Sequence, residues 1–479
     1  MNKRTELLKS TLLALLVATS VVLFANSWSG RPGSGENENL ITQFASAVGL
    51  GGFLNNEISL TSGTDVISPV SIIYTSGAKR IIFNKGTDMY NSVYGNILSV
   101  LLCAENVTHN EKVPSSEWYS AQKTQGIYLN YGVSFKRGVF EKGTGCPLPE
   151  EIKNVSAVIL TSNDSATNKL VIYIYDYTEG EFYKLLTSVS ARTVEKLLSD
   201  ADGYTNIPIA EELGFSTDSE INRQIVIDGN AVINLEQQKL QNISFKSVSG
   251  GFSALDNRNV NFLLSLFDMS KSSAKQYADI DGTMYIDTYG TLRFSEKESV
   301  SVLEFNAAKE THGVSLENNS QGGEIFYDIL YTGYSKARAV SEIFETDNLS
   351  FYIASNITTP DENGYTVQLD YVSEGVPVFA TEEGTETHAV TMKFNLSGEL
   401  IYYRKYHFEL SPGNGYSNIP GVLDAINLVY SAIGTNEEPI HIKDISACYK
   451  LNEAKAEACL CVITGKNDKI YTIPSNNTE

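Results

Sequence analysis

The chain has 479 residues, with 57 acidic and 36 basic side chains and a formal net charge of −21 at pH 7. This excess of negative charge argues against nucleic acid and anionic lipid headgroups as ligands, because both require a positive protein surface. The 5 cysteines are sparse and odd in number, which argues against a fold that depends on a dense set of disulfides.

Residues 10–28 form an uncharged, mostly apolar segment that is preceded by three basic residues, Lys3, Arg4 and Lys9. A membrane-spanning helix needs about 20 predominantly apolar residues. Trp28 stands where an aromatic side chain anchors such a helix at the membrane interface. We therefore expect a transmembrane helix at 10–28, with residues 1–9 in the cytoplasm and the bulk of the chain outside, as the positive-inside rule requires.

The same segment has a second interpretation as a signal peptide that is cleaved after export. Its dense apolar core, 12–25, is short enough for the central region of such a peptide, and Ala25-Asn26-Ser27 offers a passable cleavage site. No cysteine follows before Cys103, so a lipoprotein processing motif is absent. We expect the segment to be retained, which predicts a single-pass protein of the cell membrane with an extracytoplasmic bulk.

Small residues recur along one face of the predicted span, at Ser10, Ala14, Ala18 and Ala25. Small side chains at this spacing allow a partner helix to approach closely in lipid. This face is our candidate partner-binding surface. The alternative is that Ala and Ser are merely common in such segments.

A polar Gly/Pro linker at 29–39 leads into a region where strand and helix patterns alternate. Runs rich in β-branched and aromatic residues, separated by Asn, Asp and Gly, predict strands at 68–77, 78–86, 125–135, 155–162, 168–177, 180–188, 283–290, 291–296, 300–306, 349–356, 364–375, 388–398, 399–410, 440–451, 457–465 and 469–474. Apolar residues at helical spacing predict helices at 40–49, 88–102, 190–200, 259–269, 324–344 and 420–434.

Clusters of strands separated by helices predict an α+β fold with antiparallel sheets packed against helices. We expect three outer domains, at 40–235, 236–345 and 346–479, with the first boundary inside the irregular interval 204–255. The 27 tyrosines fall mostly within the strand runs, where amphipathic rings suit a half-exposed sheet face. A binding groove is the alternative place for these rings.

A search for catalytic and metal-binding motifs finds none with the required spacing. The sequence has no nucleophile elbow, no H-E-x-x-H, no P-loop and no dinucleotide fingerprint. The pair Cys459 and Cys461 reads as buried strand cysteine rather than a metal or redox pair, since no histidine is near. The Asp-Gly sequences at 200–203 and 279–282 read as turns, because the later ligands of a calcium loop are missing. We expect no catalytic residue, no metal and no cofactor.

The order of these features resembles the YycH family of Gram-positive bacteria. A basic stub and a single span precede "SPVSIIY", "SEWYSAQKTQGIYLNYGVSF" and the segments 262–294 and 365–406, and the chain then closes with "IHIKDISACYKL". These diffuse patterns cover most of the chain. Members of the family are membrane-anchored regulators of the WalK–WalR two-component system.

The resemblance implies a regulator without catalysis. It would act on a WalK-type sensor histidine kinase together with a YycI-like protein, through transmembrane and extracytoplasmic contacts, in cell-wall homeostasis signalling. The C-terminal domain would be YycI-like. Two other classes stay open from the residues alone. One is an extracytoplasmic ligand-binding protein of the envelope, and the other is a wall-acting hydrolase that uses a carboxylate pair.

Overall fold

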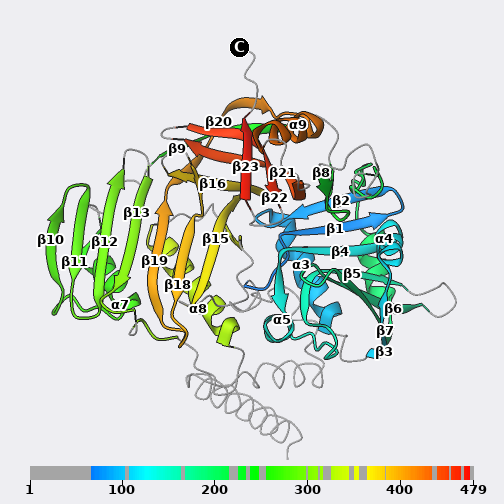
Figure 1. Cartoon of the computed structure of the whole chain (residues 1–479), viewed down its shortest axis with the longest axis horizontal. Coiled ribbons are helices and arrows are strands. Elements are labelled where there is room, and N and C mark those ends of the chain that lie inside the picture. Colours follow the sequence, from blue (N-terminus) through cyan, green and yellow to red (C-terminus); the bar gives the residue numbers. More distant parts are fainter. Residues whose placement is uncertain are drawn as a thin grey trace, which may run out of the picture. The chain divides into compact units, whose positions relative to one another are not determined.

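A computed structural model shows a sheet-dominated α+β fold (Figure 1). All described residues belong to one compact unit. The structure describes residues 66–102, 107–162, 168–214, 225–233, 238–246, 255–297, 300–310, 313–316, 325–344, 350–354, 364–382, 385–433, 440–452, 455–464 and 469–474.

The first sheet has seven strands, all antiparallel, in the order β2-β1-β4-β5-β6-β7-β3. Its strands are β1 (Ser71–Ser76), β2 (Lys79–Asn84), β3 (Val107–Val113), β4 (Gly126–Lys136), β5 (Asn154–Ser162), β6 (Lys169–Asp176) and β7 (Glu181–Ser190). The first two strands meet at the predicted tight turn, in which Ser76 faces Lys79 and Gly77 has φ 64°. A positive φ at this position suits glycine because it has no Cβ.

Strand alternation divides the apolar side chains of this sheet between two faces. On β1, Ile72 and Tyr74 belong to the main core cluster, while Ile73 belongs to a separate cluster on the other face. The helices that contribute to the main cluster include α3 (Asp88–Leu101), α5 (Arg137–Thr144) and α6 (Arg192–Ser199). On the other face, α4 (Ser115–Lys123) contributes Trp118, which is fully buried.

The second sheet connects fourteen strands along the path β10-β11-β12-β13-β19-β18-β15-β16-β21-β22-β23, with β14, β17 and β8 attached beside it. Its strands are β8 (Ile225–Ile227), β10 (Lys275–Asp279), β11 (Gly282–Ile286), β12 (Gly290–Lys297), β13 (Val300–Ala307), β14 (Ser350–Ile353), β15 (Tyr365–Ser373), β16 (Val376–Glu382), β17 (Thr385–Thr387), β18 (Val390–Phe394), β19 (Leu400–His407), β21 (Ile440–Asn452), β22 (Lys455–Thr464) and β23 (Lys469–Pro474).

Strand β21 departs from the predicted antiparallel pattern. It pairs antiparallel with β22, but it pairs parallel with both β16 and β8. All other strand pairs described in this sheet are antiparallel. The α+β class and its mainly antiparallel sheets are therefore confirmed, with these two parallel pairings as the exception.

Three helices and a short ribbon complete the description. The helices are α7 (Asn257–Leu266), α8 (Ile325–Ile343) and α9 (Val422–Ile433), and the ribbon pairs β9 (Lys239–Lys246) with β20 (Glu409–Asn418). Lys405 of β19 is fully buried and donates a hydrogen bond of 2.6 Å to the carbonyl of Ala337, which ties α8 to the sheet. Burial lowers the pKa of this lysine well below its usual range.

Most predicted elements within the described residues are present, including the helices that became α3, α6, α7, α8 and α9. Helices α4 and α5 were not predicted. The Asp-Gly sequence at 279–282 forms the turn between β10 and β11, as expected, and the carboxylate of Asp279 accepts a hydrogen bond from Arg293. Cys459 and Cys461 are buried on one face of β22 beside Cys448, which confirms the strand interpretation.

The predicted transmembrane helix at 10–28 lies outside the described residues. Within those residues, no helix is long and apolar enough to cross a membrane. The domain boundaries predicted from the sequence stay predictions.

Candidate functional site

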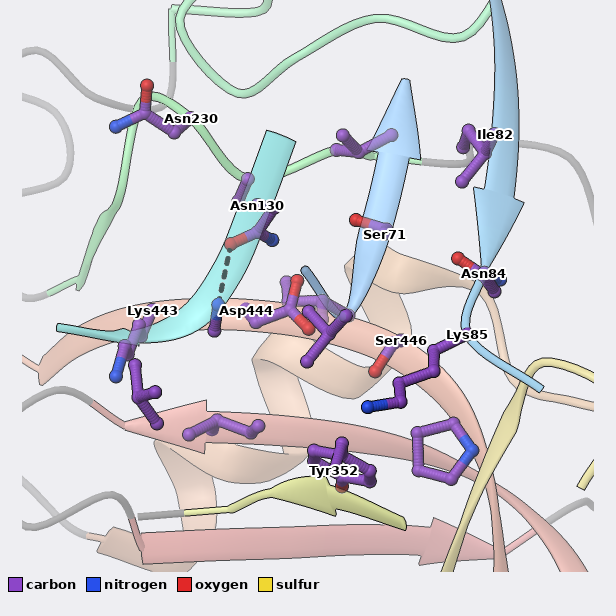
Figure 2. A pocket seen from close by; sticks show the side chains of 18 of the residues that line it. Ser71, Ile82, Asn84, Lys85, Asn130, Asn230, Tyr352, Lys443, Asp444 and Ser446 are labelled. Carbon is purple, nitrogen blue, oxygen red and sulfur yellow. Dashed lines mark hydrogen bonds between the residues drawn. The ribbon is translucent and has the colours of Figure 1, made fainter. Parts of the chain in front are cut away.

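A pocket of about 400 Å³ lies between strands of the two sheets (Figure 2). One side comes from β1, β2, β4, β5 and β6, and the other from β14, β16, β21, β22 and β23. The loop at 228–232 and β9 close further parts of the wall. Ligand pockets in proteins typically have about 300–1,000 Å³, so this pocket is large enough for a small organic molecule.

A β-bulge places two charged side chains of β21 in the pocket wall. The register between β21 and β22 shifts after Ile442, where it pairs with Thr464, to Asp444, which pairs with Ile463. Lys443 is therefore the extra residue of the bulge, and both Lys443 and Asp444 line the pocket (Figure 2). Bulges redirect side chains in this way and are frequent next to functional sites.

A hydrogen-bond relay holds the second carboxyl group of the pocket, that of Asp228. The side-chain oxygen of Asn230 accepts bonds from Trp118 Nε1 at 2.6 Å and from Gln122 Nε2 at 3.0 Å, both on α4. Asn230 in turn donates to Asp228 Oδ1 from its backbone nitrogen at 2.9 Å and from Nδ2 at 2.8 Å. The relay thus connects α4 to the pocket wall through side chains that are almost entirely buried.

Burial controls the protonation of both carboxyl groups. It raises the pKa of Asp228 above its ordinary value, although the donors of Asn230 and the charge of Lys443 oppose this shift. It likewise raises the pKa of Asp444, against the hydrogen bonds from Ile445 and Ser446 and the charge of Lys443; the nearby Asp228 adds to the increase. In such surroundings, a positively charged neighbour stabilises the ionised form of a carboxyl group.

Tyrosines form a large part of the wall: Tyr128, Tyr175, Tyr177 and Tyr352 all line the pocket. Burial raises the pKa of Tyr128 and Tyr352 well above the ordinary value, so both hydroxyl groups stay protonated. Tyr128 is 5% exposed, and the carboxyls of Asp228 and Asp444 contribute to its shift. Other tyrosines, such as Tyr90 and Tyr94, pack in the main core cluster, and a binding role for the tyrosines of the pocket stays a prediction.

Two lysines of the pocket wall already have partners. Lys85 Nζ donates to Ser68 Oγ at 2.6 Å and lies 5.7 Å from the centre of the Tyr334 ring. Lys443 Nζ lies 5.5 Å from the centre of the Tyr177 ring. In both cases, cation–π attraction to the tyrosine ring stabilises the ammonium group in its observed position.

The residues proposed from the sequence as a partner-binding face, Ser10, Ala14, Ala18 and Ala25, lie outside the described residues. The carboxyl pair of the pocket was not predicted. Among the described residues, no group of three or more His, Cys, Asp or Glu side chains has a geometry suited to a metal ion.

Comparison with known proteins gives fold similarity only. No protein-family model matches the sequence, and no curated protein matches it. The structure is similar to that of YycH from Bacillus subtilis, with 11% identity and a TM-score of 0.52 over 85% of this chain and 96% of that chain. This similarity confirms the YycH-like fold that the sequence resemblance predicted.

Two weaker similarities support no inference. A protein from Eubacterium rectale described as uncharacterized has 12% identity and a TM-score of 0.34, over 53% of this chain and 87% of that chain. The C-terminal domain of YpeB from Bacillus megaterium has 11% identity and a TM-score of 0.21, over 46% of this chain and 96% of that domain.

Proposed function

We propose that this chain, which has a YycH-like fold, is a non-enzymatic, membrane-anchored regulator of a WalK-type sensor histidine kinase. The fold similarity to YycH across most of both chains is the observation that supports the proposal. The regulator acts with a YycI-like protein, through the span at 10–28 and through extracytoplasmic contacts. It is a single-pass protein of the cell membrane, and its bulk is extracytoplasmic.

The proposed mechanism is helix contact within the bilayer. The face formed by Ser10, Ala14, Ala18 and Ala25 allows a partner helix to approach closely, because small side chains keep the two backbones near each other. A contact of this kind transmits a change in the outer part to the kinase by shifting the relative position of helices. No step of bond formation or cleavage by this chain is required.

Co-purification in detergent tests this function. The full-length chain is isolated from its own cells in three versions, and recovery of the WalK-type kinase and the YycI-like protein is measured. The versions are the native chain, a variant with Leu at the four small positions, and a matched control with Thr19→Leu and Ser27→Leu. The control positions fall on the other face of the predicted helix, at about 100° per residue.

Recovery of both partners with the native chain and the control, but not with the four-leucine variant, supports contact in the bilayer. Recovery with all three versions moves the contact to the outer part and overturns the helix mechanism. Recovery with none contradicts the regulator function itself. Digestion of the outer part by a protease added to intact cells would support the proposed topology, and protection would contradict it.

The pocket favours a second candidate function, that of an extracytoplasmic ligand-binding protein of the cell envelope. Its observation is independent of the fold similarity: two partly buried carboxyl groups line a pocket of about 400 Å³. Surroundings that raise the pKa of two carboxyl groups lower stability at neutral pH, and a ligand that uses these groups would offset that loss. A ligand-binding role and kinase regulation are compatible in one chain.

A further inference from the structure

The polar groups of the pocket are partly buried and keep accessible surface. Burial is the largest cause of the raised pKa values of Asp228, Asp444 and Tyr352. All three are nevertheless only half-buried, and all three line the pocket. Figure 2 shows Tyr352 and Asp444 in the pocket wall, on β14 and β21 respectively.

Hydrogen-bonding capacity inside the pocket is left over. Both bonds from Asn230 to Asp228 end on Oδ1, which leaves Oδ2 without a donor among the described residues. The hydroxyl of Tyr128 makes no hydrogen bond to any described residue although the side chain is 5% exposed, and the charges of both carboxyls add to the increase of its pKa. Neither oxygen is among the fully buried unpaired atoms of the described residues, so both are open to water or to a ligand in the pocket.

The charges of the pocket indicate the sign of the ligand. Lys443 is the cation that acts on both Asp228 and Asp444, so one positive charge stands against two carboxyls in this cluster. Lys85 is committed elsewhere, because its ammonium is bonded to Ser68 and lies over the ring of Tyr334. A further positive charge between the carboxyls would complete the neutralisation and allow both groups to ionise.

The rest of the wall indicates the body of the ligand. Aliphatic side chains line the pocket together with the four tyrosine rings: Ile73, Ile82, Val133, Leu460 and Ile463. Tyrosine faces attract cations by about 0.5–2 kcal/mol, and aliphatic side chains bury apolar groups. The wall therefore suits a molecule that carries one ammonium group on an apolar body.

We infer that the pocket binds a small organic cation, with its ammonium group between Asp228 and Asp444 and its apolar body against the tyrosine rings. The hydroxyl of Tyr128 accepts a further hydrogen bond from the ammonium group. This inference rests on the second candidate function above, ligand binding in the pocket. It does not depend on contact with a kinase.

Calorimetric titration of the full-length chain in detergent tests the inference, with protein-free micelles as the blank. Three probes of nearly equal shape are compared: phenethylammonium, the neutral phenethyl alcohol and the anionic hydrocinnamate. We expect saturable binding of the cation, because only the cation neutralises the carboxyls. The affinity for the neutral probe should be lower by a factor of about ten or more, and the anion should not bind.

Variants locate the binding in the pocket. Asp444→Asn keeps the shape and the hydrogen-bonding oxygen but removes the charge, and should weaken binding of the cation about tenfold or more. Tyr128→Phe should weaken it by a smaller factor. Asp200→Asn, at an exposed position outside the pocket, should change nothing. Thermal unfolding of each variant checks that the fold is kept, so that a loss of binding is not a loss of folding.

Each remaining outcome overturns the inference in a recognisable way. Equal binding of the cation and the neutral probe, or binding that Asp444→Asn leaves unchanged, would show that the carboxyls do not select charge. Binding of hydrocinnamate that pocket variants abolish would keep the ligand-binding function and reverse the ligand class. If no probe binds, this inference and the second candidate function both fail, whereas co-purification with the kinase would leave the regulator function standing.

Discussion

Asn230 should be the most sensitive single position of the pocket wall. It is 7% exposed, and its side chain is the only acceptor described for Trp118 Nε1. Its substitution by leucine keeps the volume but removes the acceptor for two donors of α4, those of Trp118 and Gln122, and one donor to Asp228. The change therefore acts through hydrogen bonds rather than through a cavity.

The structure gives the size of the effect. A buried donor that loses its acceptor costs about 1–3 kcal/mol, so the two donors from α4 together cost about 2–6 kcal/mol. Asp228 keeps its bond from the backbone nitrogen at position 230, which limits its own contribution. We expect Asn230→Leu to lower the free energy of unfolding by about 4 kcal/mol.

Urea denaturation followed by tryptophan fluorescence measures this loss. The chain has 2 tryptophans, Trp28 and Trp118, so Trp28→Phe in the background leaves Trp118 as the reporter of the relay. The matched control is Asn306→Leu, at an exposed asparagine whose side chain bonds, among the described residues, only to the side chain of Glu304 at 2.9 Å. We expect this control to change stability by no more than about 0.5 kcal/mol. If Asn230→Leu costs no more than the control, the relay does not stabilise the pocket and the reasoning is wrong.

Three further predictions concern charge and packing. Arg80→Met breaks the ion pair of the buried Arg80 with the partly exposed Glu212 at 2.8 Å, and should cost about 1.5–3 kcal/mol in urea denaturation because a carboxylate loses its partner. Asp444→Asn should raise the midpoint of thermal unfolding at pH 7 but not near pH 3. Burial raises the pKa of this carboxyl in the folded state, so the Asp444 side chain favours folding only at low pH. That contribution to stability is lost as the pH rises through the folded pKa. Gly143→Ala should lower the midpoint of thermal unfolding, because the added methyl group would lie 2.3 Å from the buried side chain of Ile67. At Gly95 no atom lies within 4 Å of an added methyl group, so Gly95→Ala should raise stability by about 1 kcal/mol.

Local structure was predictable where the signal is local. The turn at Gly77 and the helix that became α3 follow from neighbouring residues alone, through turn chemistry and apolar spacing. Helix α4 was missed because its nine residues are mostly polar, and the side chains that bury it, above all Trp118, are too few to show a period.

Strand order was not predictable, because partners lie far apart in the sequence. β13 pairs with β19, and β8 pairs with β21, and neither pairing leaves a trace in local periodicity. The same separation hid the pocket, whose carboxyls come from residues 228 and 444. Pairings of this kind can be recognised only once the sheet is assembled.

One signal of the pocket was present in the sequence and was not used. The apolar residues of β21 run Ile440, Ile442 and then Ile445, all buried, so the alternation slips by one position at Lys443 and Asp444. Such a slip predicts a bulge, because side chains alternate strictly in a regular strand. Two adjacent opposite charges at the slip mark the place where the strand turns polar groups into the interior.

The connectivity of the two sheets has a consequence for how the chain folds during synthesis. The seven-stranded sheet uses only residues between 71 and 190, so it can form as soon as that part has emerged. In the larger sheet, β8 must wait for β21 and β13 for β19, which leaves unpaired strand edges until synthesis is nearly complete. Closing such long loops is slow, and exposed edges invite aggregation in the interval. A truncation that removes β21 should therefore leave the seven-stranded sheet folded. The remaining strands of the larger sheet should then stay unpaired and bind chaperones.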